Sequence, residues 1–215
     1  METRAALPAR LARDLDGSFP DLVADQQDRL YTIALRLLGD RRDAEEVAQD
    51  ALVRAYRAIA TYPPERIRAL HLAPWLASIT VNLSRNRRRR RDDRVPPLAL
   101  DPMIEAGFDP PTDDRRGPAT TTARSETKRE LAEALLTLPP AVRSAVVLRH
   151  VDGLSVAETA EALGRPQGTI KAQVHRGLAQ LRSLLGGGAA VGHRTNDPTA
   201  STPRPSALAA LEARP

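Results

Sequence analysis

The feature that most constrains this chain is a short run, residues 155–170, in which two helix boundaries are marked one after the other. Ser155 and Glu158 have the S-x-x-E spacing of a capping box, which predicts that a helix begins at Ser155. Gly164 can adopt the left-handed backbone conformation that ends a helix, and Pro166 suits the first position of the next one. We therefore expect two short helices joined by a tight turn.

The second of these helices is amphipathic. Its predicted inward face repeats at intervals of three and four residues, through Ile170, Val174, Leu178, Leu181 and Leu185. Polar side chains fall outside this face, among them Lys171, Gln173, Arg176 and Arg182. Two helices joined by a short turn that contains glycine form a helix-turn-helix, whose second helix lies in a DNA major groove. The sequence thus predicts a reader of duplex DNA.

The overall charge agrees with this prediction. The chain has 215 residues, a formal net charge of +5 and a pI of about 10.3, which favours polyanionic partners. An arginine-rich composition inherited from a GC-rich genome is the alternative explanation. There is no cysteine, which excludes disulfides and thiol catalysis, and no apolar run approaches the 18 residues of a membrane span. We expect a cytoplasmic protein without membrane insertion.

Composition divides the chain into five segments, and no segment has a useful β pattern, so the expected fold class is all-α. Two small helical domains, residues 21–91 and 128–185, are predicted to be joined by a flexible, acidic, proline-rich linker over residues 92–127. Residues 1–20 are expected to be a frayed leader. Residues 186–215 are expected to be a disordered tail, with a helical turn near residues 207–213.

Charge is unevenly distributed around the first domain boundary. Six of the seven residues 85–91 are arginine, and such a cluster repels itself unless a counter-charge neutralises it. The following segment, residues 92–122, holds seven acids against three arginines. The acidic segment has an alternative explanation, namely a run of solvated charge with no partner. For the arginine cluster, binding to a polyanionic partner is the favoured interpretation.

The first domain shows three helical patterns. One ends at Gly39 and Asp40, a second opens near Asp43, and a third runs from about Pro74 into the arginines. The second carries an acidic ridge on its outer face, formed by Asp43, Glu46, Gln49 and Asp50. Acids in the first turn complement the helix dipole, but Asp50 lies two turns in and indicates a basic partner surface.

These motifs together resemble the sigma-70 family of bacterial RNA polymerase initiation factors, specifically the compact extracytoplasmic-function (ECF) group. The resemblance covers a little over half of the chain in two blocks. The matching segments are Leu37-Leu38-Gly39-Asp40, residues 43–52, Trp75-Leu76 with Ile79 and Asn82-Leu83, Leu138-Pro139-Pro140, Gly153-Leu154-Ser155, and Gly168-Thr169-Ile170-Lys171 with His175-Arg176. Two blocks in the family's order are far more specific than a lone helix-turn-helix.

The resemblance implies a role for each part of the first domain. The ridge of Asp43, Glu46, Gln49 and Asp50 is implied to bind core RNA polymerase at the clamp region of its largest subunit. The promoter −10 element is implied to be read by a region 2-like domain, residues 21–91, which would capture a flipped base in a loop around residues 62–72. Its implied contacts are Tyr62, Asn82, Arg85, Asn86, Arg87, Arg88 and Arg89. Trp75 is expected in the core rather than as a stacking platform.

The second domain is implied to be region 4-like, to read the −35 element as duplex and to contact the polymerase flap. Lys171 and Arg176 would pair with guanine edges or phosphates, Gln173 with adenine, and Ala172 with a thymine methyl group. His175, Arg149 and Arg165 would contact the DNA backbone. The sequence departs from the family at Asn86, where an acid is common, and in its few aromatic residues, which favours capture of few bases.

No catalytic motif, P-loop or paired metal-binding histidines occur, so we expect no enzyme activity, no metal and no cofactor. The implied partners are core RNA polymerase, promoter DNA and an anti-sigma factor. One alternative is a free-standing operator-binding regulator, and another is a pure protein-interaction module. A weaker hypothesis is that the acidic linker mimics nucleic acid inside the polymerase and is displaced by growing RNA.

Overall fold

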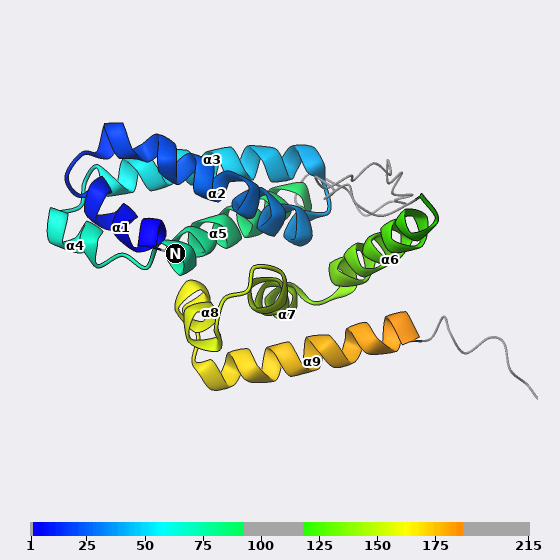
Figure 1. The fold of residues 1–215 in the computed structure, drawn as a ribbon. Coiled ribbons are helices and arrows are strands. Elements are labelled where there is room, and N and C mark those ends of the chain that lie inside the picture. The colour runs from blue at the N-terminus through cyan, green and yellow to red at the C-terminus, as the bar shows by residue number, and fades with distance from the viewer. Residues whose placement is uncertain (1, 93–117, 187–215) are drawn as a thin grey trace, which may run out of the picture.

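The computed structural model describes residues 2–92 and 118–186, and every secondary-structure element in these two ranges is a helix (Figure 1). The all-α prediction is therefore confirmed. The first range holds α1 (Glu2–Leu11), α2 (Leu15–Leu38), α3 (Arg41–Ile59), α4 (Pro64–Arg68) and α5 (Leu72–Asp92). The second holds α6 (Pro118–Thr137), α7 (Pro140–Val146), the π-helical turn η1 (Val147–Val151), α8 (Val156–Leu163) and α9 (Gln167–Gly186).

Helices α2, α3 and α5 pack pairwise into the core of the N-terminal domain. The face of α3 that enters this core is built from small side chains, and Ala44, Ala51 and Ala55 are completely buried. Small residues allow neighbouring helices to approach closely, and larger residues such as Leu30 and Ile33 of α2 fill the remaining space. The break between α2 and α3 follows the prediction, because Gly39 has φ +75° and the Asp40 side chain accepts from the Asp43 N–H.

The leader predicted for residues 1–20 is wrong. Helix α1 and the first part of α2 occupy this segment, and Leu7 and Leu11 are buried in the core. Pro8 and the glycine and proline that follow gave the segment a loop-like composition. However, Asp14 caps α2 by accepting from the Gly17 N–H at 2.9 Å, and burial of the two leucines outweighs the cost of Pro8 inside α1.

The helix-turn-helix forms as predicted. The Ser155 hydroxyl accepts from the Glu158 N–H at 3.1 Å, and the Glu158 carboxylate accepts from the Ser155 N–H at 2.8 Å, which completes the capping box. Gly164 ends α8 with φ +60°. Helix α9 begins at Gln167, one residue later than expected, so Pro166 precedes the helix. Within α9, Ile170 and Leu181 are buried, whereas Leu185 was wrongly expected to face inward and is exposed.

The linker is shorter than its predicted bounds, because α6 begins at Pro118, inside the segment 92–127. Its first turns are rich in alanine and threonine and carry few large apolar groups, so composition gave no sign of a helix there. The helix is held by its C-terminal half, where Ala134 and Leu135 are buried. The acidic residues 93–114, and with them the nucleic-acid-mimicry hypothesis, lie outside the described residues, as do the tail and the turn near residues 207–213.

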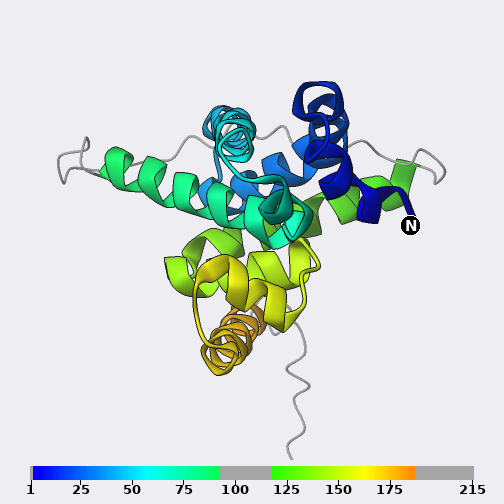
Figure 2. The ribbon, with the colours of Figure 1, turned by 90° about the vertical axis from the view of Figure 1, so that its left-hand side faces the viewer.

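The two domains pack directly against each other. Helix α8 lies against α5, and α2 contacts α6, α7 and η1 (Figure 2). Arg29 of α2 forms a two-pronged ion pair with Asp152, with N–O distances of 2.5 and 2.6 Å, and the Asp152 side chain is only 1% exposed. His71 and Glu161 add an exposed contact of 3.2 Å between ring nitrogen and carboxylate. The sequence pattern gave no indication of this closed arrangement.

Candidate nucleic-acid interface

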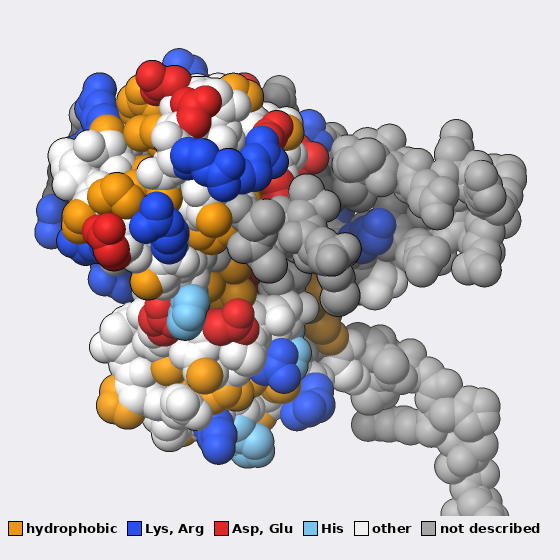
Figure 3. All heavy atoms as spheres, turned by 60° about the vertical axis from the view of Figure 1, so that its left-hand side comes forward, with side chains coloured by type: hydrophobic (Ala, Val, Ile, Leu, Met, Phe, Trp, Pro, Cys, Tyr) orange, Lys and Arg blue, Asp and Glu red, His pale blue; other side chains and the backbone are white. Residues whose placement is uncertain are grey.

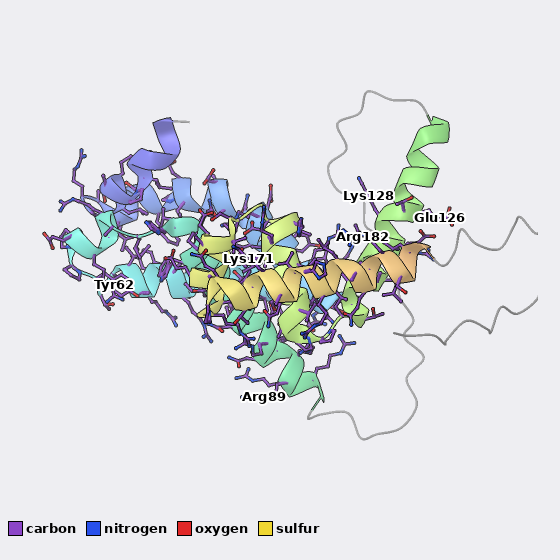
Figure 4. All side chains as sticks on the ribbon, turned by 90° about the horizontal axis from the view of Figure 1, so that it is seen from below. Tyr62, Arg89, Glu126, Lys128, Lys171 and Arg182 are labelled. Carbon is purple, nitrogen blue, oxygen red and sulfur yellow. The ribbon has the colours of Figure 1, made fainter. Side chains whose placement is uncertain are left out.

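Helix α9 lies on the side of the C-terminal domain that faces away from the N-terminal domain (Figures 1 and 2). The side chains of Lys171, Ala172, His175 and Arg176 are exposed there, and Figure 4 shows the helix crossing its face of the molecule from Lys171 to Arg182. Basic side chains also lie on both lobes in Figure 3. An exposed helix with cations and small residues in its first turns can enter a major groove without rearrangement of its own domain.

Three residues of this domain that were predicted to contact DNA are not simply exposed on the outer face. Gln173 is half-buried, and its Oε1 is buried without a hydrogen-bond partner. Arg149 is half-buried and donates to the Leu154 carbonyl at 3.4 Å. Arg165 is exposed in the turn, but it lines a cavity against the N-terminal domain. In this arrangement the polar groups of Gln173 and Arg149 are turned toward the protein, and Arg165 faces the N-terminal domain.

The polar side chains of α5 lie on three different sides of the helix. Asn82, Asn86 and Arg89 are exposed on one face, at helical intervals of four and three residues. Arg85 and Arg88 line the cavity that faces the C-terminal domain. The predicted −10 contacts therefore do not form one surface in this closed arrangement.

Arg87 is on the third side and lies against α3. Its guanidinium contacts Asp43 at 2.6 Å and Glu46 at 2.7 Å, and Arg91 lies 4.0 Å from Asp43. The hydrogen bond that Arg87 donates to Asp43, together with the negative charges of Asp43 and Glu46, raises the pKa of Arg87 above its ordinary value despite some desolvation. The expectation that Arg87 clamps phosphate does not match this placement, because its charge is already neutralised within the domain.

Because of these contacts with Arg87, only part of the acidic ridge of α3 is exposed. The Asp43 side chain is only 16% exposed and is bound by arginine, so its expected outward orientation is wrong. Glu46 is partly exposed but also paired. Gln49 and Asp50 are exposed, so the C-terminal end of the ridge faces solvent.

The segment around residues 62–72 is more ordered than a loop, because α4 lies within it. Tyr62 and Trp75 are both half-buried, with ring centroids 6.2 Å apart, and the Arg66 guanidinium lies 3.7 Å from the Tyr62 centroid. Trp75 packs against the hydrophobic core but is not completely enclosed. An aromatic pair with a cation beside it can hold a flat base, and sequence alone did not assign Arg66 to it.

Within the described ranges, no group of three or more histidine, cysteine, aspartate or glutamate residues could hold a metal ion. The same ranges contain no helix that is both long and apolar enough to cross a membrane.

A helix-turn-helix beside a second helix that ends in arginines is typical of an all-helical nucleic-acid-binding protein. Comparison with known families agrees in both parts. Residues 22–94 match the family described as Sigma-70 region 2, and residues 128–181 match Sigma-70, region 4.

Relatives along most of the chain belong to one group. The ECF RNA polymerase sigma factor SigE of Mycolicibacterium smegmatis is 36% identical over 179 residues, covering 78% of this chain and 62% of that protein. The ECF RNA polymerase sigma factor SigW of Bacillus subtilis is 32% identical, covering 78% of this chain and 89% of that protein. The chain belongs to the sigma-70 family as an ECF RNA polymerase sigma factor, and its function is promoter-directed initiation of transcription by RNA polymerase.

Solved structures agree with the fold. CnrH in its complex with the cytosolic domain of CnrY has a TM-score of 0.61 and 26% identity, covering 85% of this chain and 97% of that chain. The sigma factor RpoE from Bartonella quintana, in complex with the anti-sigma factor NepR, has a TM-score of 0.57 and 23% identity, covering 78% of this chain and 96% of that chain. The second likeness concerns the fold alone.

Proposed function

We propose that this chain binds core RNA polymerase through α3 and reads the −10 and −35 elements through α5 and α9. The observation that carries this proposal is the presence, on one chain, of two basic helices of different design and a separate acidic surface. A free-standing regulator needs only the helix-turn-helix and leaves the exposed Gln49 and Asp50 and the arginine cluster without a role. Initiation chemistry belongs to the polymerase, and the chain itself acts in the cytoplasm without enzyme activity, metal or cofactor.

The −35 element is read by α9. Lys171 and Arg176 pair with guanine edges or phosphates, and Ala172 lies against a thymine methyl group, since each is exposed on the outer face. Gln173 pairs with adenine after its amide turns outward, a movement favoured because its buried oxygen has no partner to lose. His175, Arg149 and Arg165 contact phosphates and set the position of the helix.

The −10 element is read along α5. Asn82, Asn86 and Arg89 form its exposed reading face, while Arg85 and Arg88 bind phosphates once the C-terminal domain has moved away. The flipped base lies beside Tyr62, with Trp75 as the inner wall. Tyr62 and Arg89 lie toward opposite ends of α5 in Figure 4, and a helix of 21 residues spans about 30 Å, enough to follow several nucleotides. Arg87 remains with Asp43 and Glu46.

The closed arrangement must open for both elements to be read by one chain. Centres near −10 and −35 are about 25 base pairs apart, or roughly 85 Å of duplex at about 3.4 Å per base pair. Two packed domains of this size cannot reach across that distance. Opening breaks the Arg29–Asp152 pair and exposes Arg85, Arg88 and Arg165 together. An anti-sigma factor is a further partner of the chain, by analogy with the complex of CnrH.

Run-off transcription tests the polymerase role. The full chain mixed with core polymerase on a pool of promoter fragments is expected to give specific transcripts, while the chain alone binds duplex DNA weakly. Tight sequence-specific binding by the chain alone, with no effect on core polymerase, would support a free-standing regulator instead.

The α3 assignment is tested by Asp50→Arg, which reverses the charge of an exposed ridge residue. It is expected to abolish core-polymerase binding in a pull-down and to leave the affinity of the isolated chain for −35 duplex unchanged. Asp28→Arg, an equal charge reversal at an exposed position of α2, is the matched control and should retain core binding. Equal loss in both variants, or loss of DNA affinity with Asp50→Arg, would contradict the assignment.

A further inference from the structure

A cavity of about 170 Å³ lies between the two domains, where α5 faces α7 and the turn of the helix-turn-helix. Four of its ten lining residues are arginines. Arg85 and Arg88 come from the N-terminal domain, and Arg143 and Arg165 come from the C-terminal domain. Two serines and four apolar residues complete the lining, which contains no aspartate or glutamate. The cavity is therefore strongly positive, and its charge comes equally from both domains.

Arg143 gives this cavity a buried charge. The residue is 7% exposed, and its guanidinium donates to the carbonyl oxygens of Leu37 at 2.8 Å, Leu138 at 3.0 Å and Leu136. These acceptors are neutral, so they satisfy hydrogen bonds without neutralising the charge. The Nε–H is buried and has no hydrogen-bond partner. A buried cation with an unused donor is costly unless an anion completes the site.

Arg88 increases this cost. Desolvation, followed by the positive charge of Arg88, lowers the pKa of Arg143 to about 10. Arg143 therefore stays protonated at neutral pH, although its environment disfavours the charge. The repulsion between Arg88 and Arg143 acts across the domain boundary, so a bound anion would turn a repulsive contact between the domains into an attractive one.

We propose that this cavity binds a small phosphate-bearing anion, with the guanidinium groups of Arg88, Arg143 and Arg165 around it. The planar N–H forks of arginine match phosphate oxygens, and four cations favour a diphosphate group over a single phosphate. Duplex DNA is excluded from this position while the domains are packed, because the cavity lies between the two domains and Arg143 is almost completely buried. The ligand is therefore a small molecule, either inorganic or the diphosphate end of a nucleotide.

Binding has a consequence for the state of the protein. The anion contacts both domains only when they are packed, so it stabilises the closed arrangement by mass action. It also occupies Arg88 and Arg165, two of the arginines that are proposed to contact DNA. The anion is thus a negative effector of DNA binding by the chain, and its binding to the chain can be measured without polymerase or promoter.

Calorimetric titration of the full chain with sodium diphosphate, at constant ionic strength and without divalent metal, tests the proposal. We expect saturable binding of one diphosphate per chain and a melting temperature that rises with its concentration. Arg88→Gln and Arg165→Gln each remove one charged donor at a position that keeps solvent contact, so both should fold. Each is expected to weaken binding by about tenfold.

Arg89→Gln is the matched control, because it makes the same change one residue along α5 at an exposed position outside the cavity. It should change the affinity by less than about twofold. An equal loss with Arg89→Gln, or absence of saturation, would overturn the site. A glutamate-rich peptide that binds in place of diphosphate would overturn the assignment to a phosphate compound. Equal affinities for ADP and diphosphate would show that the diphosphate group alone accounts for binding. Tighter binding of ADP would show that the ligand is a nucleotide.

Discussion

At the residue scale, the closed structure depends on a few pairs of charged side chains whose partners are far apart in the sequence. Arg29 and Asp152 are the clearest pair. The Asp152 carboxylate is almost fully buried, and Arg29 completes its hydrogen bonds with the Gln26 side chain and the Ala73 carbonyl. Removing one partner of such a pair leaves the other charge buried and uncompensated.

Asp152→Asn is expected to lower the free energy of unfolding by about 3 kcal/mol, the lower end for a buried pair, because Arg29 remains 18% exposed. Urea unfolding of the full chain measures the change. Asp21→Asn, which removes the surface partner of Arg10, is the control and should cost about 1 kcal/mol or less. Similar costs for the two variants would show that the Arg29 contact contributes no more than a surface ion pair.

Glu158 supplies a pH-dependent contribution. Hydrogen bonds from Ser155, through the side chain first and the backbone second, lower the pKa of Glu158 in the folded chain. The stabilisation is therefore present above the unfolded-state pKa of about 4.3 and is lost as pH falls through the lower folded value. Glu158→Gln should be less stable than wild type at pH 7, and the difference should shrink below about pH 4.

Thermal unfolding at a series of pH values measures that difference. Glu130→Gln, at an exposed position of α6, provides the comparison, and its difference from wild type should not follow the same pH course. A Glu158→Gln difference that is constant from pH 7 to pH 3 would show that the capping carboxylate does not titrate as described.

At the element scale, α9 is the helix that we propose reads the −35 element, and it also holds its domain together. Its buried side contains Gly177 as well as leucine and isoleucine. A Cβ atom at Gly177 would lie 2.5 Å from Cγ2 of Val146 and 2.8 Å from Cγ1 of Val142. Valine side chains are stiff, so α7 would have to move away from α9.

Gly177→Ala is expected to destabilise the chain by about 1–3 kcal/mol through overpacking, although alanine is the better helix former. Gly168→Ala, on the same helix with no atom within 4 Å of the added Cβ, should instead be neutral or stabilising by up to about 1 kcal/mol. Thermal unfolding compares the two. A stabilised Gly177→Ala variant would show that α7 and α9 are packed less closely than the structure has them.

Elements with local signals were predictable from the sequence. Gly39, Gly164 and the Ser155–Glu158 capping box each determine a helix end through residues within four positions, and each was assigned correctly. Helix α1 was missed because its stability comes from burial of Leu7 and Leu11 against distant residues, while Pro8 suggested a break. The start of α6 was missed because its first turns have no apolar periodicity.

At the scale of the whole molecule, the packing of one domain on the other could not be predicted. No motif in the sequence singled out Arg143, yet it donates to the Leu37 carbonyl 106 residues away. The ion pairs of Arg87 could not be predicted for the same reason, because its partners Asp43 and Glu46 belong to another helix. A cluster of arginines in the sequence predicts a negatively charged partner. Tertiary packing decides which of these arginines remain exposed and free to contact that partner.

We propose that one polymerase-bound chain reads two promoter elements at a fixed separation. Run-off transcription from a promoter selected with the holoenzyme, with 5 base pairs inserted between the elements, tests it most directly. The insertion rotates one element by about half a helical turn relative to the other. We predict that the specific transcript falls at least tenfold, while duplex binding to the isolated −35 element is unchanged. Transcription that is indifferent to the insertion would contradict the claim.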